Sequence, residues 1–587
     1  MAQEKWMSRG TRALNRVHAR LSALARPATG FVSQPEPRTI GSFARGRQLV
    51  AGNLLFAGQL HQDDGSGLWA IGAGAPPDPA RDEETHGFAW LDDLAAVGDR
   101  PARLVAQKWL WDWIARYGRG GGAGWTPELT GRRLIRWIHH AIFLLNGQDT
   151  AQSQAFYRSL ARQTIFLGRR WKGALPGLPR FEALTGLIYA GLSLEGMERL
   201  VDPAVKALAR DCRTQISGEG GIPTRNPEEL LEVCTLLTWA AAALREAGKT
   251  VPPEIMSAIE RIAPSLRSLR HADGGLARFH GGGRGLEGRL DWALANSGVK
   301  TRHADGLAMG YARLSAGRTS VIIDAAPPPG GKASFDAHAS TLAFELTSGR
   351  RPLIVNCGSG AHFGEDWRRA GRATPSHSAL ALEGYSSARL GRIGPRREML
   401  VDAPREVPVQ ITHAEQGLRF EGGHDGYLKT HGLTHARTLD LSSDGRGLKG
   451  EDLLVAIEAP DQVRFDAAMD AAALQGIPYQ VRFHLHPEVD ASLDMGGAAV
   501  SLALKSGEVW VFRTDGSTKI SLEPGVYLEK NRLKPRAAQQ IVLSGRALEY
   551  ATRLRWTLSK TVETPVSIRD LKQDGPGAPY APEYEVE

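Results

Sequence analysis

Cysteine is scarce in this sequence: Cys212, Cys234 and Cys357 are the three present in 587 residues. They lie far apart, without the paired spacing of a zinc-binding motif, and their odd number argues against a disulfide framework. We expect all three to be small buried residues. The sequence therefore does not indicate a disulfide-rich secreted domain or a cysteine-ligated metal site.

Long apolar runs are missing as well. The first ten residues, MAQEKWMSRG, contain no apolar segment of the kind found in a secretory signal. The stretch from Leu14 to Ala25 is interrupted by Arg, His and Asn, and no stretch is long and apolar enough for a membrane-spanning helix. The pattern predicts a basic amphipathic helix over Met1–Ala25 that packs on the body of the protein, and a cytoplasmic location.

A strong excess of one charge is also lacking. The chain has 72 Lys and Arg and 64 Asp and Glu, which gives a net charge of +8 spread along its length. Two interpretations stay open, an ordinary basic globular protein and one attracted to a polyanion such as an acidic polysaccharide. Nucleic acid is not an expected partner, because no recognised binding motif accompanies the charge. The Gly-rich stretch His271–Gly283 follows no strand and precedes no Lys-Ser/Thr, which excludes a phosphate-binding P-loop.

Helical spacing of apolar residues fills the first half of the chain, and short strands fill the second. Helices are predicted over 102–117, 127–145, 151–172, 180–195, 202–216, 227–247 and 253–269. From Thr319 short apolar runs alternate with turns, as in an antiparallel β-sandwich. The predicted parts are an N-terminal helix, linker and irregular segment (1–91), a helical bundle or toroid (92–318), a sandwich (319–558) and a Pro-rich acidic tail (559–587).

The stretch Ser334–Gly360 lies where the two halves meet. A polar turn at Ser348–Arg350 separates two apolar runs, which predicts a hairpin. The hairpin would bring His338 and Asn356 to one end of a sheet, and His377 comes just before the next predicted strand. Polar groups that converge at strand ends, beside Gly-rich backbone, are typical of a binding or active site.

The order of His338, Asn356-Cys-Gly and Ser376-His-Ser resembles the C-terminal domain of the heparinase II/III-like polysaccharide lyases. The resemblance covers about residues 40–558. It implies a multidomain α+β fold, an α/α toroid followed by an antiparallel β-sandwich, in a bacterial carbohydrate-binding protein. It also implies β-elimination of an acidic, uronic-acid-containing polysaccharide, and a periplasmic or envelope location as the alternative to the cytoplasm. Such a lyase needs a base for the C5 proton, an acid for the leaving oxygen and a group that neutralises the carboxylate.

At the family's sandwich positions this sequence departs from the family's residues. Asp336 stands at the first His of the family's His-x-His-x-Asp motif, the His to which catalysis is assigned, and His338 stands at the second. Some relatives bind zinc through the second His, an Asp and a later His, whose places are taken here by His338, Asn356 and His377. An amide is a poor zinc ligand, although Asp336 could serve as the third one. We predict that no zinc copurifies and that the two His form a hydrogen-bonded structural pair.

The toroid positions are altered too. The family's Gly-Asn-His becomes Gly177-Leu-Pro, whereas Arg225 and Asn226 match a second motif that ends in Tyr, near which this chain has Glu229. The candidate catalytic residues are therefore Asp336, His338 and Glu229, and the candidate substrate-binding residues are Arg225, Asn226 and Arg372. Asn226 before a Pro is also a local signal for a helix N-cap.

Three functions stay open. The first is a divergent lyase for an acidic polysaccharide, and the second is an inactive acidic-glycan-binding or scaffold protein on the same fold. The third is a glycoside hydrolase that uses two carboxyl groups from the set Asp273, Glu228, Glu229 and Asp336. For any of them we expect Arg225 and the pair His338 and His377 to face one cleft between the two domains, where Arg372 also lies.

Overall fold

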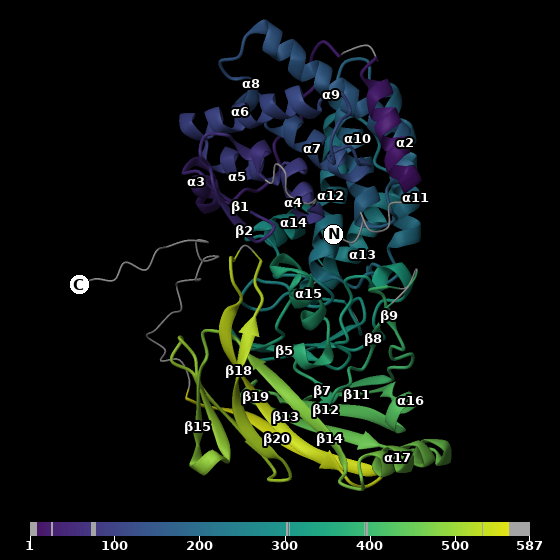
Figure 1. Cartoon of the computed structure of the whole chain (residues 1–587), viewed down its shortest axis with the longest axis vertical. Helices are drawn as coiled ribbons and strands as arrows, with labels where there is room; N and C mark the ends of the chain where they lie inside the picture. The colour runs from purple at the N-terminus through teal and green to yellow at the C-terminus, as the bar shows by residue number, and fades with distance from the viewer. Residues whose placement is uncertain are drawn as a thin grey trace, which may run out of the picture.

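The computed structural model describes residues 9–24, 28–71, 78–300, 303–304, 306–392, 394, 397–530 and 532–562. Helices up to α14 make up one half of the molecule, and the strands from β3 onwards make up the other (Figure 1). This confirms the predicted fold class, an α/α toroid followed by an antiparallel β-sandwich. The predicted C-terminal tail lies outside the described residues from 563 onwards.

The long helices of the toroid begin and end close to where the apolar spacing predicted them. Their starts are fixed by side-chain caps at Asp99, Thr126, Asp149 and Asn226, each of which accepts a backbone N–H of the first turn. One predicted helix is broken at His140 into α7 and α8. The bounds are α6 (Arg100–Tyr117), α7 (Pro127–His139), α8 (Ala141–Leu145), α9 (Thr150–Arg170), α10 (Leu178–Ser193), α11 (Val201–Gln215), α12 (Pro227–Glu246) and α13 (Pro253–Ser268).

Shorter elements complete this domain. Helix α2 (Arg9–Ser22) lies within the predicted N-terminal helix and packs along α9. Three short helices and a hairpin precede or overlap residue 92; the sequence indicated an irregular segment with short strand pieces over 41–72, where the hairpin lies, but not the helices. These elements are α3 (Phe43–Val50), α4 (Pro79–His86), α5 (Ala89–Val97), β1 (Asn53–Phe56) and β2 (Gln59–Gln62), and α14 (Arg289–Asn296) closes the domain.

The inner helices α7, α10 and α12 are neighbours. Helices α7 and α10 approach closely because Gly131 faces Gly186, where an added Cβ would lie 2.4 Å from the Gly131 Cα. This contact joins the second turn of α7 to the middle of α10. At the start of α12, Glu229 reaches back to the start of α10, because its Oε1 lies 3.9 Å from the place that a Cβ on Gly177 would take. Helix α10 therefore packs between α7 and α12.

The β-sandwich consists of two antiparallel sheets. One has the order β10-β11-β12-β13-β20-β17-β16-β15, and the other has the order β18-β19-β14-β6-β5-β4-β3 with β7 paired to β14. Burial alternates along β12, which shows that one side of this strand faces the shared core, whereas β4 and β5 are buried along their whole length. The strands with their bounds are β3 (Tyr311–Ala316), β4 (Thr319–Asp324), β5 (Phe344–Ser348), β6 (Arg351–Val355), β7 (Leu380–Leu382), β8 (Arg389–Leu390), β9 (Leu400–Val401), β10 (Val409–Ala414), β11 (Gly417–Tyr427), β12 (Leu433–Ser442), β13 (Gly447–Val455), β14 (Ile477–Leu485), β15 (Asp490–Asp494), β16 (Ala499–Ala503), β17 (Val509–Thr514), β18 (Lys519–Tyr527), β19 (Arg536–Ala547) and β20 (Ala551–Val562).

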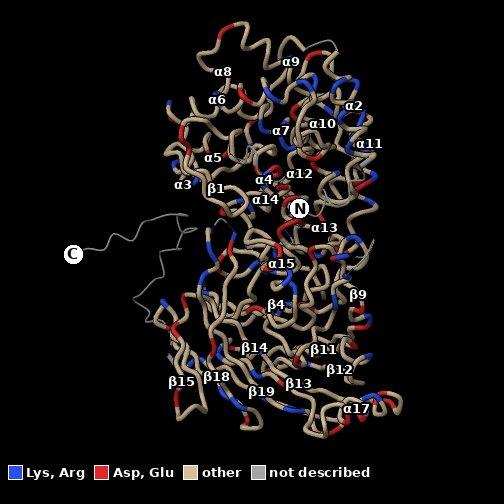
Figure 2. Tube along the Cα trace, in the orientation of Figure 1, with Lys and Arg blue, Asp and Glu red and all other residues tan. Residues whose placement is uncertain are grey.

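Three helices accompany the sheets: α15 (Glu365–Gly371), α16 (Leu428–His431) and α17 (Ala459–Ala471). Lys and Arg are scattered over both domains rather than gathered on one face in this view (Figure 2). None of the helices in the described ranges has the length and apolarity needed to cross a membrane. The cysteines Cys212, Cys234 and Cys357 are buried and unpaired, as predicted.

Candidate functional site

The Gly-rich stretch His271–Gly283 forms the joint between the domains. The Arg278 side chain donates to the carbonyl oxygens of Cys357 and Leu528, and its backbone N–H donates to the Glu345 carboxylate. The Gly281 N–H donates to Nε2 of His338 at 3.1 Å. The stretch His271–Gly283, called the plug below, therefore covers the end of the sandwich where the predicted site residues lie.

His338 and His377 form a hydrogen-bonded pair, as predicted. The carbonyl of Ala373 can only accept, so Nδ1 of His377 carries the proton in their 2.9 Å contact. In the neutral ring Nε2 of His377 then accepts from Nδ1 of His338 at 3.0 Å, which leaves Nε2 of His338 to accept from Gly281. Burial keeps both rings neutral: it lowers the pKa of His377 to about 4 and that of His338 well below its ordinary value.

The predicted zinc ligands do not fit a metal ion. Each ring nitrogen of His338 and His377 already has a protein partner, so no lone pair is free to bind zinc. Asn356 is also engaged, because its Oδ1 accepts from Ser378 and its amide lies 3.4 Å from Glu345. Asp336 instead pairs with Arg368 at 3.3 Å. Within the described ranges, no three or more His, Cys, Asp or Glu side chains are arranged to hold a metal. The absence of copurifying zinc stays a prediction.

Arg225 lies buried at the joint between the domains, and its role in substrate binding stays a prediction. Its guanidinium donates to the carbonyls of Met309, Gly310, Ala326 and Pro327 and to the Asp324 carboxylate. These five hydrogen bonds use all five donors, so none is left for a ligand. Arg225 and His280 both have left-handed backbone conformations, with φ of 50° and 47°, which indicates that packing at the joint holds them there.

Arg372 and Asn226 also hold the backbone in place. Arg372 is buried and donates to the carbonyls of Ala337 and Ser334, and its predicted contact with substrate also stays a prediction. Asn226 accepts from the N–H groups of Glu228 and Glu229 and is the N-cap of α12, as its place before Pro227 indicated. Neither side chain lies free in a substrate cleft.

The expected shared cleft is instead a buried chain of polar contacts, in which Nε2 of His280 makes no hydrogen bond within the described part of the protein. Arg225 binds Asp324 at 2.6 Å, and Asp324 lies 3.4 Å from Nε2 of His280. Nδ1 of His280 accepts from the His338 backbone N–H, and His338 binds His377. The predicted residues thus lie on the same side of the toroid, but these side chains are buried between the domains rather than exposed to a ligand.

Glu229 and Asp336 are the predicted catalytic residues that keep exposed surface. Glu229 accepts from the hydroxyl of Thr224 at 2.8 Å. Burial and the nearby charge of Asp336 raise the pKa of Glu229 to about 7. The other carboxyl groups considered for hydrolysis are paired, Glu228 with Lys530 and Asp273 with Arg284.

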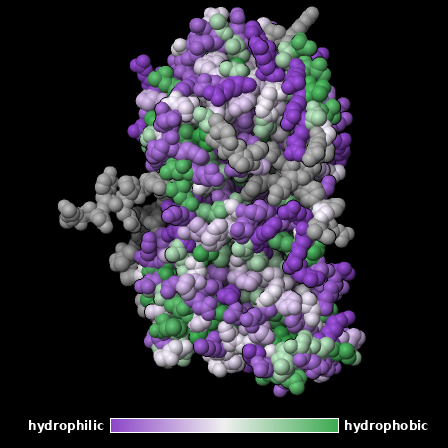
Figure 3. Space-filling view, viewed as in Figure 1, coloured by the Kyte–Doolittle hydropathy of each residue, from purple (hydrophilic) through white to green (hydrophobic). Residues whose placement is uncertain are grey.

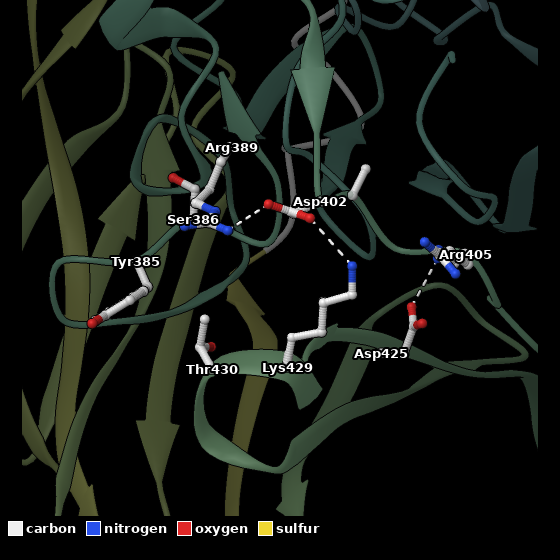
Figure 4. A pocket seen from close by; sticks show the side chains of 10 residues that line it. Tyr385, Ser386, Arg389, Asp402, Arg405, Asp425, Lys429 and Thr430 are labelled. Atoms are coloured by element: carbon white, nitrogen blue, oxygen red, sulfur yellow. Dashed lines mark hydrogen bonds and ion pairs between the residues drawn. The ribbon is translucent and has the colours of Figure 1, made fainter. Parts of the chain in front are cut away.

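A hollow on the surface of the sandwich lies elsewhere, and none of the predicted site residues lines it. Figure 4 shows Asp402 between Arg389 and Lys429, and the Arg405 backbone N–H binds Asp425 at 2.8 Å. Tyr385, which also lines the hollow, is 44% exposed. Two carboxylates among three basic side chains give this hollow a mixed charge that selects no ligand class by itself.

Sequence reasoning missed His280 and Asp324, the two residues that link Arg225 to His338. They stand in separate segments, a Gly-rich loop and the end of a strand, and no local motif pairs them. It also missed Glu182, whose place one turn into an apolar helix could have indicated a buried carboxyl group.

The fold and the site together define a two-domain protein of the polysaccharide lyase architecture. Residues 298–557 match the family model described as "Heparinase II/III-like, C-terminal". The crystal structure of heparinase III aligns over 92% of this chain and 88% of its own with a TM-score of 0.64 and 12% identity. A mutant of heparan sulfate lyase HepC from Pedobacter heparinus aligns over 94% of this chain and 89% of its own, with a TM-score of 0.56 and 15% identity. These structures share the fold.

A curated relative is much more similar in sequence. It is "FtsZ-localized protein C" from Caulobacter vibrioides, 31% identical over 92% of this chain and 91% of the relative. The chain belongs to the heparinase II/III-like family, as its motifs indicated.

Proposed function

We propose that this chain is a non-catalytic member of its family that binds a protein partner in the FtsZ-containing assembly. The observation that carries the proposal is that all four ring nitrogens of His338 and His377 are hydrogen-bonded within the protein. A lyase needs a base with a free lone pair for the C5 proton. The partner class is taken from the relative named "FtsZ-localized protein C".

Charge also disfavours an acidic polysaccharide as a substrate at the joint. A lyase must neutralise a uronate carboxylate, but the donors of Arg225 are all used within the protein. Two groups that keep exposed surface there, Glu229 and Asp336, are themselves carboxyl groups, and like charges repel, whereas the partly exposed Lys530 is already paired within the protein. The glycoside hydrolase alternative is weakened as well, since Glu228, Asp273 and Asp336 are all held in ion pairs, which leaves Glu229 without a second unpaired carboxyl group from the set considered.

A surface around α17 is a candidate for contact with a protein partner. Five apolar side chains there are between 41% and 68% exposed: Ile457, Val463, Leu474, Leu548 and Tyr550. Tyr550 packs on Phe465 of α17, and Leu548 lies against Gly476, which follows the helix, so the group is continuous. Figure 3 shows apolar residues gathered at this end of the molecule. Exposed apolar patches of this kind favour protein association.

Sedimentation with FtsZ polymers tests the proposal. We expect the purified chain to pellet with the polymers, and Val463→Asp and Leu474→Asp to reduce the pelleted fraction at least fivefold. Ile142→Asp is the matched control, because Ile142 is 74% exposed on the other domain. Failure to pellet, or equal loss with the control variant, would contradict the proposed partner.

A second assay tests the absence of lyase activity. Heparan sulfate, chondroitin sulfate and other acidic glycans would be incubated with the protein, and unsaturated uronate products followed by near-ultraviolet absorbance. We expect no product, with heparinase III as the positive control. Product that disappears with His338→Ala would overturn the non-catalytic assignment. The proposal includes a cytoplasmic location, which cell fractionation would check against the periplasm.

A further inference from the structure

Helix α2 carries an apolar stripe that faces solvent. The helix packs along α9, with Asn15, Ala19 and Ser22 buried. The side-chain oxygen of Asn15 accepts a hydrogen bond from Arg170 of α9 at 2.8 Å. On the outer side four apolar residues are between 44% and 84% exposed: Leu14, Val17, Leu21 and Leu24. Their spacing of three, four and three residues is that of a coiled-coil seam, so the stripe is suited to contact with another helix.

A row of basic side chains lies beside this stripe. Arg12, Arg16 and Arg20 are exposed and four residues apart, so they lie on one side of the helix. Helix α2 contains no acidic residue. Because a helix turns by about 100° per residue, the Arg row and the apolar stripe occupy adjacent sectors of the exposed surface. The outer face of α2 is therefore apolar on one side and positively charged on the other.

Helix α17 presents the complementary surface. Its inner side holds the buried Phe465 and Met469. Its outer side has an apolar ridge of exposed residues: Pro460, Val463, Ala467, Ala471 and, just after the helix, Leu474. The two Ala side chains leave room for the larger Leu side chains of a partner helix. Asp466 and Asp470 are exposed beside this ridge, so the outer face of α17 is apolar on one side and negatively charged on the other.

The other charged groups around this ridge leave it acidic. Arg464 lies on the flank away from the two Asp and already pairs with Asp461 at 3.0 Å. Asp466 accepts the hydroxyl of Tyr550 at 3.0 Å, and a neutral hydroxyl does not cancel the charge of a carboxylate. Glu458 adds an exposed carboxyl group just before the helix. A partner for this surface should therefore combine apolar and basic side chains.

We propose that α2 of one copy of this chain packs antiparallel on α17 of a second copy. Antiparallel packing sets the stripe of α2 on the ridge of α17 and places the Arg row beside Asp466 and Asp470, whereas parallel packing would put the charges on opposite flanks. Figure 1 shows α2 on the helical domain and α17 at the far end of the sandwich, so the two faces can meet only between copies. A second copy accounts for both uncovered faces at once. The inference goes beyond the proposed FtsZ partner and does not rest on it.

Sedimentation velocity of the full chain, without FtsZ, tests the contact. We expect the average mass to rise above that of a monomer with increasing concentration and to fall at high salt, which screens the Arg and Asp charges. Leu21→Asp in α2 and Val463→Asp in α17 should each weaken self-association at least tenfold, because each places a charge in one apolar face. Both positions are exposed, and thermal melting checks that the variants fold. Ile142→Asp, at a 74% exposed position of α8, should leave self-association within twofold.

Mixing the two variants tests the pairing of unlike faces. The Leu21→Asp chain keeps α17 intact and the Val463→Asp chain keeps α2 intact, so the mixture should form a complex of two chains where each variant alone is monomeric. A wild-type chain that stays monomeric at every concentration, or a mixture without a complex, would overturn the proposal. Binding to phosphatidylglycerol vesicles that Leu21→Asp abolishes, in a chain that does not self-associate, would also overturn it, because a membrane would then occupy α2. None of these results depends on whether FtsZ is bound.

Discussion

Glu229 carries a carboxyl group in a place where the folded chain disfavours its charge. Its pKa is raised from 4.5 to about 7, by burial first and then by Asp336. The unfolded chain ionises near 4.5, so the stability that Glu229 contributes while protonated is lost as the pH rises from 4.5 through 7. A neutral amide at this position should therefore raise the stability of the folded protein most at alkaline pH, where Glu229 would be charged.

We therefore predict that Glu229→Gln stabilises the protein at pH 8 by about 1–2 kcal/mol, and changes stability little at pH 5. Thermal melting at both pH values would measure the effect. Glu260→Gln, exposed on α13, is the control and should behave like wild type at both. A variant that is equally destabilised at pH 5 and pH 8 would show that the carboxylate is needed for folding.

His377 has the opposite pH dependence. Burial lowers its pKa from 6.5 to about 4, so below pH 6.5 the unfolded chain takes up a proton that the folded chain does not. Stability should fall as the pH decreases from about 6.5 to 4, by on the order of 3 kcal/mol from this residue. Urea unfolding across this range should show a flatter slope for His377→Asn and an unchanged slope for His413→Asn, which alters an exposed side chain. Equal slopes in all three proteins would refute the role of His377.

At the scale of elements, local patterns predicted the helices well. Helix α12 starts at Pro227, as predicted, because Asn226 caps it and Pro227 fits the first turn. Helices α3 and α4 escaped prediction, since each has eight residues and too few apolar positions to show a period. The plug His271–Gly283 could not be assigned either, because its partners Cys357 and Leu528 follow strands far along the chain.

The cap of α12 gives an element-scale prediction. Asn226→Ala should lower the free energy of unfolding by about 1 kcal/mol, because the N–H groups of Glu228 and Glu229 lose their acceptor. Asn226→Ser keeps an oxygen acceptor and should recover most of the loss. Chemical denaturation of the two variants would measure the difference. A large loss of stability in both would mean that Asn226 acts through contacts other than the cap.

At the scale of the whole molecule, the sequence predicted the two domains but not how charged side chains are used where they meet. The net charge of +8 left attraction to a polyanion open, yet Arg225 and Arg372 bind backbone carbonyls within the protein. Glu229 and Asp336 keep exposed surface at the junction, and Lys530 is held there by Glu228. Whether a basic side chain is free or used up depends on long-range packing, which composition and local motifs do not contain.

The joint gives the last prediction. Arg225, at the start of α12, makes one buried ion pair and four carbonyl hydrogen bonds, all to the segment from Met309 to Pro327. Removing one partner of a buried pair leaves the other charge uncompensated, which costs about 3–5 kcal/mol. Arg225→Met should therefore destabilise the protein by about that amount. Because the lost contacts join the domains, we expect urea unfolding to separate into two transitions, one for the toroid and one for the sandwich.

Hydrogen exchange would locate the change. Exchange should rise at the start of α12 and in β3 and β4, while the far strands of the sandwich keep their protection. Adding Asp324→Asn to Arg225→Met should recover part of the stability, since the uncompensated carboxylate is then gone. Arg210→Ala is the control, because Arg210 is 55% exposed and its ion pair is 3.9 Å long. A single unfolding transition in Arg225→Met, with stability like that of the control, would show that Arg225 does not couple the two domains.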